Sequence, residues 1–133
     1  MHYITTGKVN TFKDAIFEYQ SDASCQTLVY DQDKQIFLCS GINKLVFPGK
    51  TYTIPTGIKA WLPCDFIGLI VNSYLLNPKL QVIPQIVLDD CYICIQIRNT
   101  GILPVKILEE EILANLILIP KLECHIVSTK GQS

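Results

Sequence analysis

Hydrophobic residues along the chain come in short segments separated by turn-forming residues. Glycine, proline and asparagine interrupt the chain repeatedly, and few of the segments between them exceed ten residues. The clearest segment, residues 93–98, places Ile93, Ile95 and Ile97 on one face of an extended chain. Short segments rich in β-branched and aromatic residues predict an all-β sandwich or barrel.

Two further segments, residues 66–71 and 113–119, are apolar almost throughout. Periodicity alone allows the second to be a helix, but its bounding prolines and β-branched residues favour a strand. Strands covered on both faces have this pattern, and two explanations stay open: a tightly packed small barrel, or an apolar face buried between subunits. We favour the second and expect a homo-oligomer. Residues 11–19 are compatible with one or two helical turns.

Composition narrows the class of protein. A chain of 133 residues suits one domain, and its 49% hydrophobic and 17% charged residues exclude a disordered chain. The net charge of −1 argues against a nucleic-acid binder. No run of about 18 apolar residues predicts a spanning helix, so we expect no membrane insertion. With six cysteines and no visible signal peptide, we expect reduced thiols and an intracellular location.

Few residues suggest chemistry by their spacing alone. Cys91 and Cys94 form a C-x-x-C, but in a strand they point to opposite faces, so we interpret them as ordinary thiols. Cys124 and His125 lack a second pair at zinc-finger spacing, and the acidic run 109–111 is typical of a solvated turn. We therefore predict no metal site and no bound cofactor.

Asp89 and Asp90, followed by Tyr92, interrupt an apolar region between two predicted strands. One interpretation is the tip of a hairpin, where aspartate is common for backbone reasons. The other is a functional site. In that case a carboxylate orients or deprotonates a water beside an aromatic ring that holds a flat or sugar-like ligand. Spacing alone favours the hairpin.

The order of several segments carries a further signal. They begin with FPGKTYTIPTGIK at residues 47–59 and continue at 62–63, 66–70, 86–89 and 114–117. This order resembles that of homotrimeric dUTP diphosphatases (dUTPases), especially the short retroviral kind. The resemblance covers about residues 33–120 and implies a jelly-roll β-barrel that forms a homotrimer with active sites between subunits. It also implies magnesium-dependent hydrolysis of dUTP to dUMP and pyrophosphate.

The motifs of that family are only partly present. Phe37 stands where the first motif has the aspartate that organises hydrated magnesium, and an aromatic ring cannot ligate a hard cation. Residues 72–75 match the second motif and keep Ser73, but they lack its phosphate-binding cation. Asn115 replaces the phosphate-reaching glutamine of the fourth motif. The 13 residues after Pro120 contain neither the arginine nor the phenylalanine of the closing arm.

The third motif keeps two of its residues. Asp89 matches the water-activating carboxylate, and Tyr92 matches the ring that packs under the deoxyribose. Where the family has glycines that let the backbone approach the uracil, this chain has Pro84 and Gln85. We therefore interpret Asp89 as a vestigial general base. The vestigial substrate contacts are Tyr92, Ser73 and Asn115.

From these matches and replacements we expect a dUTPase-derived viral accessory protein, in the cytoplasm or nucleus of a host cell, that has lost hydrolysis and binds a host protein. The enzyme alternative is a divergent, magnesium-dependent dUTPase that takes its cations from elsewhere. The candidates are Lys44, Lys50, Lys59, Lys79 and Arg98. A third alternative is a nucleotide sensor that binds without turnover.

The resemblance divides the chain into an N-terminal extension (residues 1–32), a dUTPase-like barrel (33–120) and a short C-terminal tail (121–133). The extension contains several aromatic residues, namely Phe12, Phe17, Tyr19 and Tyr30. It either wraps a neighbouring subunit or a partner, or supplies a strand that completes the barrel. Both alternatives stand at this point.

Overall fold

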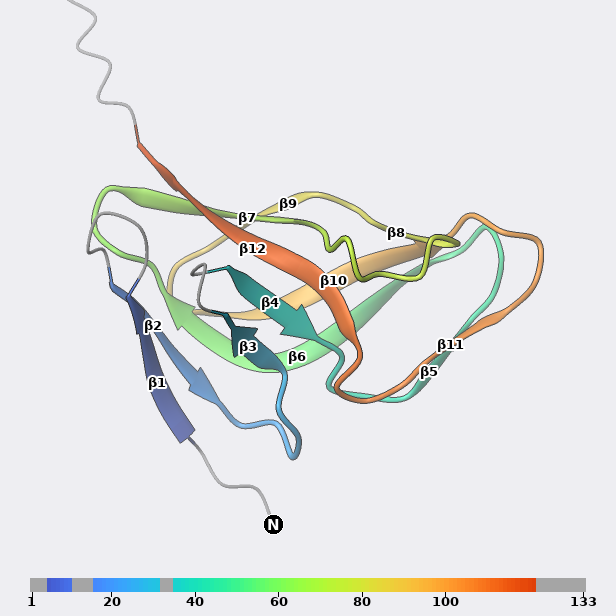
Figure 1. Cartoon of the computed structure of the whole chain (residues 1–133), viewed down its shortest axis with the longest axis horizontal. Helices are drawn as coiled ribbons and strands as arrows, with labels where there is room; N and C mark the ends of the chain where they lie inside the picture. The colour runs from blue at the N-terminus through green and yellow to red at the C-terminus, as the bar shows by residue number, and fades with distance from the viewer. Residues whose placement is uncertain (1–4, 11–15, 32–34, 122–133) are drawn as a thin grey trace, which may run out of the picture.

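The computed structural model describes residues 5–10, 16–31 and 35–121, which form strands and connections without a helix (Figure 1). The strands are β1 (Thr5–Asn10), β2 (Ile16–Ser21), β3 (Leu28–Tyr30), β4 (Ile36–Cys39), β5 (Lys44–Val46), β6 (Thr51–Trp61), β7 (Phe66–Asn72), β8 (Leu80–Val82), β9 (Gln85–Val87), β10 (Cys91–Asn99), β11 (Val105–Ile107) and β12 (Ile112–Pro120). The prediction of an all-β protein is confirmed.

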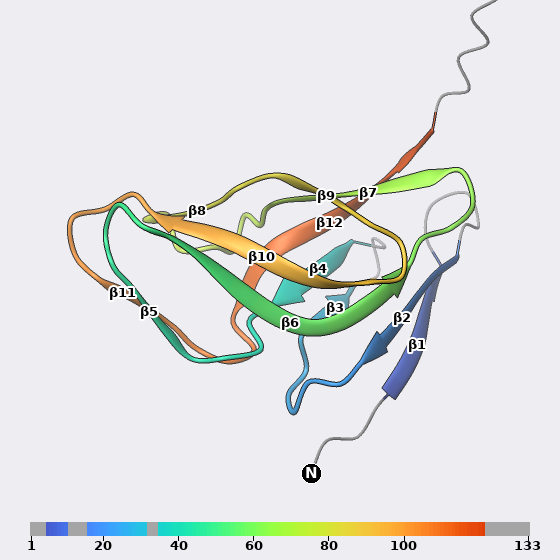
Figure 2. The same cartoon turned by 180° about the vertical axis from the view of Figure 1, so that it is seen from behind.

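The strands form two five-stranded sheets and a two-stranded ribbon. The first sheet has the order β1-β2-β6-β10-β8, the second has the order β3-β4-β12-β7-β9, and the ribbon pairs β5 with β11. Among the connections that cross between the two sheets are those from β6 to β7 and from β9 to β10. Both crossings lie at one end of the long axis, which we call the turn end (Figures 1 and 2). The ribbon extends to the opposite end, the ribbon end.

The alternation predicted for residues 93–98 is confirmed in β10. Ile93, Ile95 and Ile97 are buried in the core that both sheets share, whereas Arg98 is exposed. Burying one such side chain contributes roughly 1.5–3 kcal/mol to folding. The inward face of β10 is therefore a large part of the stability of the barrel.

The predicted strands at residues 66–71 and 113–119 are also confirmed, as β7 and β12, which pair with each other. Their inward residues, such as Ile70 and Leu116, are buried. Their outward residues are not fully covered, because Ile117 is 43% and Ile119 is 36% exposed in the single chain. A tightly packed small barrel therefore does not cover these strands on both faces, and burial between subunits stays a prediction.

Strand β6 carries a two-residue bulge opposite β10. Ile58 pairs with Ile93 and Pro55 with Cys94, so Thr56 and Gly57 have no opposite residue. Gly57 has φ 70°, a left-handed conformation that only glycine adopts without strain. Two residues are inserted rather than one, so the alternation of inward and outward side chains along β6 is the same before and after the bulge.

The bulge also binds the N-terminal part of the chain. The Asp22 N–H donates to the Gly57 carbonyl over 3.0 Å, and the Thr27 hydroxyl donates to the Thr56 carbonyl over 2.6 Å. The Thr56 hydroxyl in turn donates to the Ile93 carbonyl over 2.7 Å and accepts the Ile58 N–H over 3.1 Å. The bulge thus joins β6, β10 and the connection between β2 and β3.

The described part of residues 1–32 belongs to the two sheets. Strand β2 pairs with β6, and β3 pairs with β4. The predicted boundary at residue 32 is therefore not a structural boundary, and this segment supplies strands of the barrel. The helical turns expected at residues 11–19 are wrong for Ile16 to Tyr19, which lie in β2, while residues 11–15 lie outside the described ranges. The described ranges contain no helix of the length and hydropathy needed to cross a bilayer.

We predict that Thr56→Val destabilises the protein by about 1–3 kcal/mol, because it leaves the buried Ile93 carbonyl and the Ile58 N–H without their partner. Thr56→Ser is the matched control. It keeps the hydroxyl, so its loss should be about 1 kcal/mol or less. Urea denaturation followed by circular dichroism measures both. Equal losses for the two variants would contradict the assigned role of the hydroxyl.

Candidate functional site

Asp89 and Asp90 form the turn between β9 and β10 at the turn end. These two strands belong to different sheets, so the turn is not the tip of a hairpin, and that interpretation is corrected. Asp90 has φ 59°, a conformation that aspartate tolerates better than most residues. Its N–H donates to the Ala60 carbonyl over 2.9 Å, which holds the turn against the end of β6.

The carboxylate of Asp89 has a structural partner. Its Oδ1 accepts the Leu62 N–H over 2.7 Å, just beyond the end of β6. The neighbouring Asp90 forms an ion pair with Lys59, whose Nζ lies 3.3 Å from its Oδ1. Both side chains of the Asp pair thus join the β9–β10 turn to β6.

Tyr92 lies beside these carboxylates, at the start of β10. Its ring is 51% exposed, and its hydroxyl donates to Asp22 Oδ2 over 2.9 Å. The Lys59 Nζ lies 5.9 Å from the centre of the Tyr92 ring and 5.8 Å from that of Trp61, within the range of cation–π attraction. The hydrogen bond to Asp22 raises the pKa of Tyr92 above its ordinary value, and desolvation and the charge of Asp22 add to that effect, while Lys59 opposes it.

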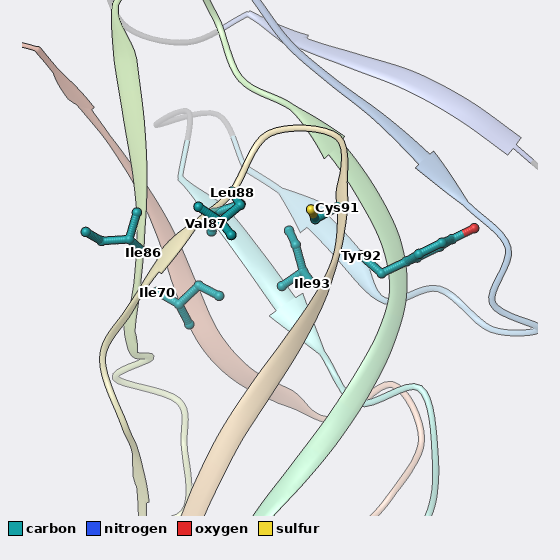
Figure 3. A pocket seen from close by; sticks show the side chains of 7 residues that line it. All are labelled: Ile70, Ile86, Val87, Leu88, Cys91, Tyr92 and Ile93. Carbon is teal, nitrogen blue, oxygen red and sulfur yellow. The ribbon is translucent and has the colours of Figure 1, made fainter.

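A cavity of about 120 Å³ opens between β9 and β10 (Figure 3). Its lining consists of Ile70, Ile86, Val87, Leu88, Cys91, Tyr92 and Ile93. In Figure 3 the Tyr92 ring extends away from the aliphatic side chains, with its hydroxyl at the far end. Most of the lining side chains are aliphatic, and Cys91 and Tyr92 add a thiol and a phenol, but polar atoms make up almost half of the exposed lining.

The side chain of Gln85 spans the space between β9 and β10. Its Nε2 donates to the Cys94 carbonyl over 2.6 Å, so its side chain bridges β9 and β10. It follows Pro84, which has no N–H to donate. The two residues that replace the expected glycines thus fill space and remove one backbone donor.

Ser73, Asn115 and Phe37 lie together on the second sheet. The Ser73 hydroxyl is buried and accepts the Leu75 N–H over 3.1 Å. Asn115 in β12 lies opposite Phe37 of β4, and its buried Oδ1 has no hydrogen-bond partner among the described residues. Phe37 is 4% exposed, with its ring 6.2 Å from that of Tyr74.

The predicted site residues fall into two groups that one chain does not bring together. Asp89 lies beside the first residues of β7, because Val87 pairs with Gly68, whereas Ser73 follows the last residue of the same strand. At ~3.3 Å per residue the two groups are roughly 20 Å apart. A single ligand could touch both groups only if they came from different subunits.

A metal site of the expected kind does not fit these residues. Phe37, at the position where the resemblance predicts a magnesium-organising carboxylate, is a buried ring without an oxygen donor. Within residues 5–10, 16–31 and 35–121, no group of three or more His, Cys, Asp or Glu is close enough to hold a metal ion. Cys91 is exposed and Cys94 is half-buried, as two separate free thiols.

Two neighbours of Tyr92 were missed by the sequence analysis, Asp22 and Trp61. Asp22 is 70 residues away along the chain and reaches Tyr92 only because the bulge holds its loop. Trp61 ends β6, two residues after Lys59, and shares the Lys59 ammonium with Tyr92. Neither residue stands in a motif, so no local signal could have indicated it.

Comparison with known proteins identifies the fold. No family model matches the chain, and no curated protein matches it. Solved dUTPase structures do match. The native dUTPase of EIAV superposes with a TM-score of 0.70 at 19% identity, covering 81% of this chain and 91% of that one. The dUTPase of Staphylococcus bacteriophage 80alpha superposes with a TM-score of 0.74 at 12% identity, covering 83% of this chain and 93% of that one. A point mutant of the dUTPase from phage phi11 of S. aureus gives 0.68 at 14% identity, with 92% and 94% covered.

These likenesses show that the chain has the dUTPase fold, over most of its length and most of theirs. The predicted jelly-roll β-barrel is therefore confirmed. At these levels of identity, activity does not follow from the fold.

We predict that Tyr92, like the half-buried Tyr19, titrates above the ordinary range and that Asp22→Asn lowers the pKa of Tyr92 alone, because the amide carries no charge and is a weaker acceptor for the Tyr92 hydroxyl. Ultraviolet absorbance of tyrosinate during an alkaline titration measures this. Since the folded-state pKa is raised, the stabilisation is present below the unfolded pKa and is lost as pH rises through the folded pKa. Asp65→Asn is the control, and it should leave the titration unchanged; a shift of the same size there would contradict the assignment.

Proposed function

We propose that this chain is a degenerate dUTPase that no longer hydrolyses dUTP and acts by binding other proteins. One observation carries the proposal: the side chains at nucleotide-handling positions are committed to internal contacts. Asp89 accepts the Leu62 N–H, Ser73 accepts the Leu75 N–H, and Phe37 is buried against Tyr74. A general base accelerates a reaction by ~10²–10⁴-fold, and it does so only when a substrate is positioned beside it.

The described residues offer few of the contacts that an active enzyme would make with the uracil ring and with the phosphates of dUTP. Most side chains that line the cavity beside Tyr92 are aliphatic, and the side chain of Gln85 is bonded to the backbone of β10. Residues 72–75 supply no cation for a triphosphate. These features support loss of both nucleotide recognition and transition-state stabilisation.

The enzyme alternative would need cations that reach the site. Lys59 is near Tyr92, but it is paired with Asp90, and Lys44 lies over the Tyr52 ring. Lys50, Lys79 and Arg98 lie toward the ribbon end, away from Asp89, and Lys79 shares the β7–β8 connection with Ser73, so it is the cation with which an active enzyme would be tested first. The half-exposed Tyr92 ring is the one feature that favours a nucleotide sensor without turnover.

A regulatory role has a parallel among the similar structures. The dUTPase of Staphylococcus bacteriophage 80alpha is described as controlling the transfer of virulence genes by a proto-oncogenic G protein-like mechanism. The similar structures from EIAV and from phages also support a viral origin for this chain, and with it a place in the cytoplasm or nucleus of a host cell. We propose a host protein as its partner.

We further propose that the protein is a homotrimer whose subunits cover the outer face of the second sheet. Paired strands place apolar side chains side by side on that face, with Asn115 as the one polar member among the described residues. They are Val29, Phe37, Val71, Ile67, Leu69, Ile86, Ile117 and Ile119. Ile86 is 60% exposed in the single chain, and exposed sheet faces of this kind are typical of subunit interfaces.

We predict no magnesium-dependent release of pyrophosphate from dUTP and no calorimetric binding of a non-hydrolysable dUTP analogue at micromolar protein. Turnover that is abolished by Asp89→Ala would overturn the proposal and establish a divergent enzyme. Binding without turnover that is lost in Tyr92→Ala would establish a nucleotide sensor. Asp65→Asn is the control for both, since it changes an exposed carboxylate that is not part of the cavity lining.

We predict that Ile117→Asp reduces the mass measured by light scattering from that of a trimer to that of a monomer, because it places a charge in the middle of the apolar face. Ile16→Asp is the matched control, as Ile16 is 44% exposed on the first sheet. Circular dichroism verifies that both variants are folded. A wild-type mass of one chain would contradict the trimer, and so would a folded Ile117→Asp trimer.

A further inference from the structure

The ribbon end presents apolar side chains to solvent. Ile102 is 91% exposed, Leu103 60% and Phe47 45%. They belong to the β10–β11 and β5–β6 connections, which lie together at the extreme of the long axis in both views (Figures 1 and 2). We call these three side chains the apolar tip.

Asn99 holds both loops of the apolar tip in one conformation. Its side chain is buried, and its Nδ2 donates to the Val46 carbonyl over 2.9 Å and to the Leu103 carbonyl over 2.8 Å. Its Oδ1 accepts the Gly101 N–H over 2.8 Å, and its own carbonyl accepts the Gly49 N–H over 3.0 Å. The tip is therefore preorganised, so little ordering entropy is lost when it binds.

Exposed cations surround the apolar tip. Lys50 follows Gly49, Arg98 precedes Asn99, and Lys106 lies in the ribbon opposite Leu45. The carbonyl of Lys79 accepts both the N–H and the hydroxyl of Thr100, over 2.8 and 3.0 Å. We call these four residues, Lys50, Lys79, Arg98 and Lys106, the basic flank. The ion pairs formed within the described ranges involve Lys8 and Lys59, so the basic flank has no carboxylate partner there.

Acidic residues are absent from the sequence around the apolar tip. The stretches 44–64, 66–88 and 91–108 contain no aspartate or glutamate. The acidic residues between these stretches, Asp65, Asp89 and Asp90, lie in connections at the turn end. A chain with a net charge of −1 thus concentrates positive charge at its ribbon end.

We propose that the apolar tip and its basic flank bind peripherally to an anionic lipid surface. Aliphatic side chains at the apex enter the boundary between headgroups and acyl chains, while lysine and arginine behind them reach the anionic headgroups. The tip is convex, so a protein partner would need a pocket shaped for Ile102, whereas fluid lipid needs none. Three apolar side chains make a surface contact, far short of a spanning segment.

Sedimentation of the full chain with lipid vesicles tests the proposal. We expect binding to vesicles of phosphatidylcholine and phosphatidylserine, weakened by salt, and little binding to phosphatidylcholine alone. The double variant Ile102→Ser and Leu103→Ser should lower the affinity at least about tenfold. Leu108→Ser is its matched control, as Leu108 is 51% exposed near the other end of the ribbon. Lys79→Gln should lower the affinity about fivefold, and Lys121→Gln should leave it unchanged.

A fluorescence probe reports which end touches the lipid. The single tryptophan, Trp61, ends β6 near the turn end, so its emission should not change when vesicles bind. In Ile102→Trp, the added tryptophan should shift its emission to shorter wavelength with phosphatidylserine vesicles and be quenched by brominated lipid.

Several results would overturn the proposal. They are binding that does not depend on phosphatidylserine, equal losses in Leu108→Ser and the tip variant, or an unshifted Ile102→Trp. Binding of poly-glutamate without binding of vesicles would assign the same end to an acidic protein instead. Circular dichroism of each variant separates these outcomes from a failure to fold. None of them depends on whether the chain hydrolyses dUTP.

Discussion

The two-residue bulge at Thr56 and Gly57 is the constraint on which the rest of the barrel depends. It lets β6 bend while its inward residues keep their phase, because an insertion of two preserves the alternation of a strand. Its carbonyls and the Thr56 hydroxyl bind β10 and the loop between β2 and β3. A strand without the bulge would leave these buried polar groups unpaired and the N-terminal strands without their anchor.

The same anchor explains the surroundings of Tyr92. The bulge holds Asp22 through its N–H, and this places the Asp22 carboxylate against the Tyr92 hydroxyl. Lys59, Asp90 and Asp89 complete a set of contacts that join the β9–β10 turn to β6. Side chains that a nucleotide enzyme would keep free for substrate thus stabilise the turn itself. These side chains already have partners within the chain, and this supports the proposal that binding has replaced chemistry.

The two ends of the barrel differ in charge. Asp65, Asp89 and Asp90 lie in the connections of the turn end, while the ribbon end carries cations around exposed apolar side chains. The apolar outer face of the second sheet lies along the strands between these ends. The surfaces proposed for self-association and for lipid contact are therefore separate, and neither includes Asp89.

The sequence by itself determined the all-β class, the inward face of β10, and the replacement of motif residues such as Phe37. These features are local, since the alternation of a strand and the chemistry of one side chain are set by neighbouring residues. Only the tertiary structure decided that β2 joins the first sheet, that the Asp pair links two sheets rather than two strands of a hairpin, and that Asp22 meets Tyr92. It also decided that Asp89 and Ser73 lie at opposite ends of β7. Each of these depends on which distant strands pair, and hydrogen bonds between residues far apart in the chain leave no local pattern to read.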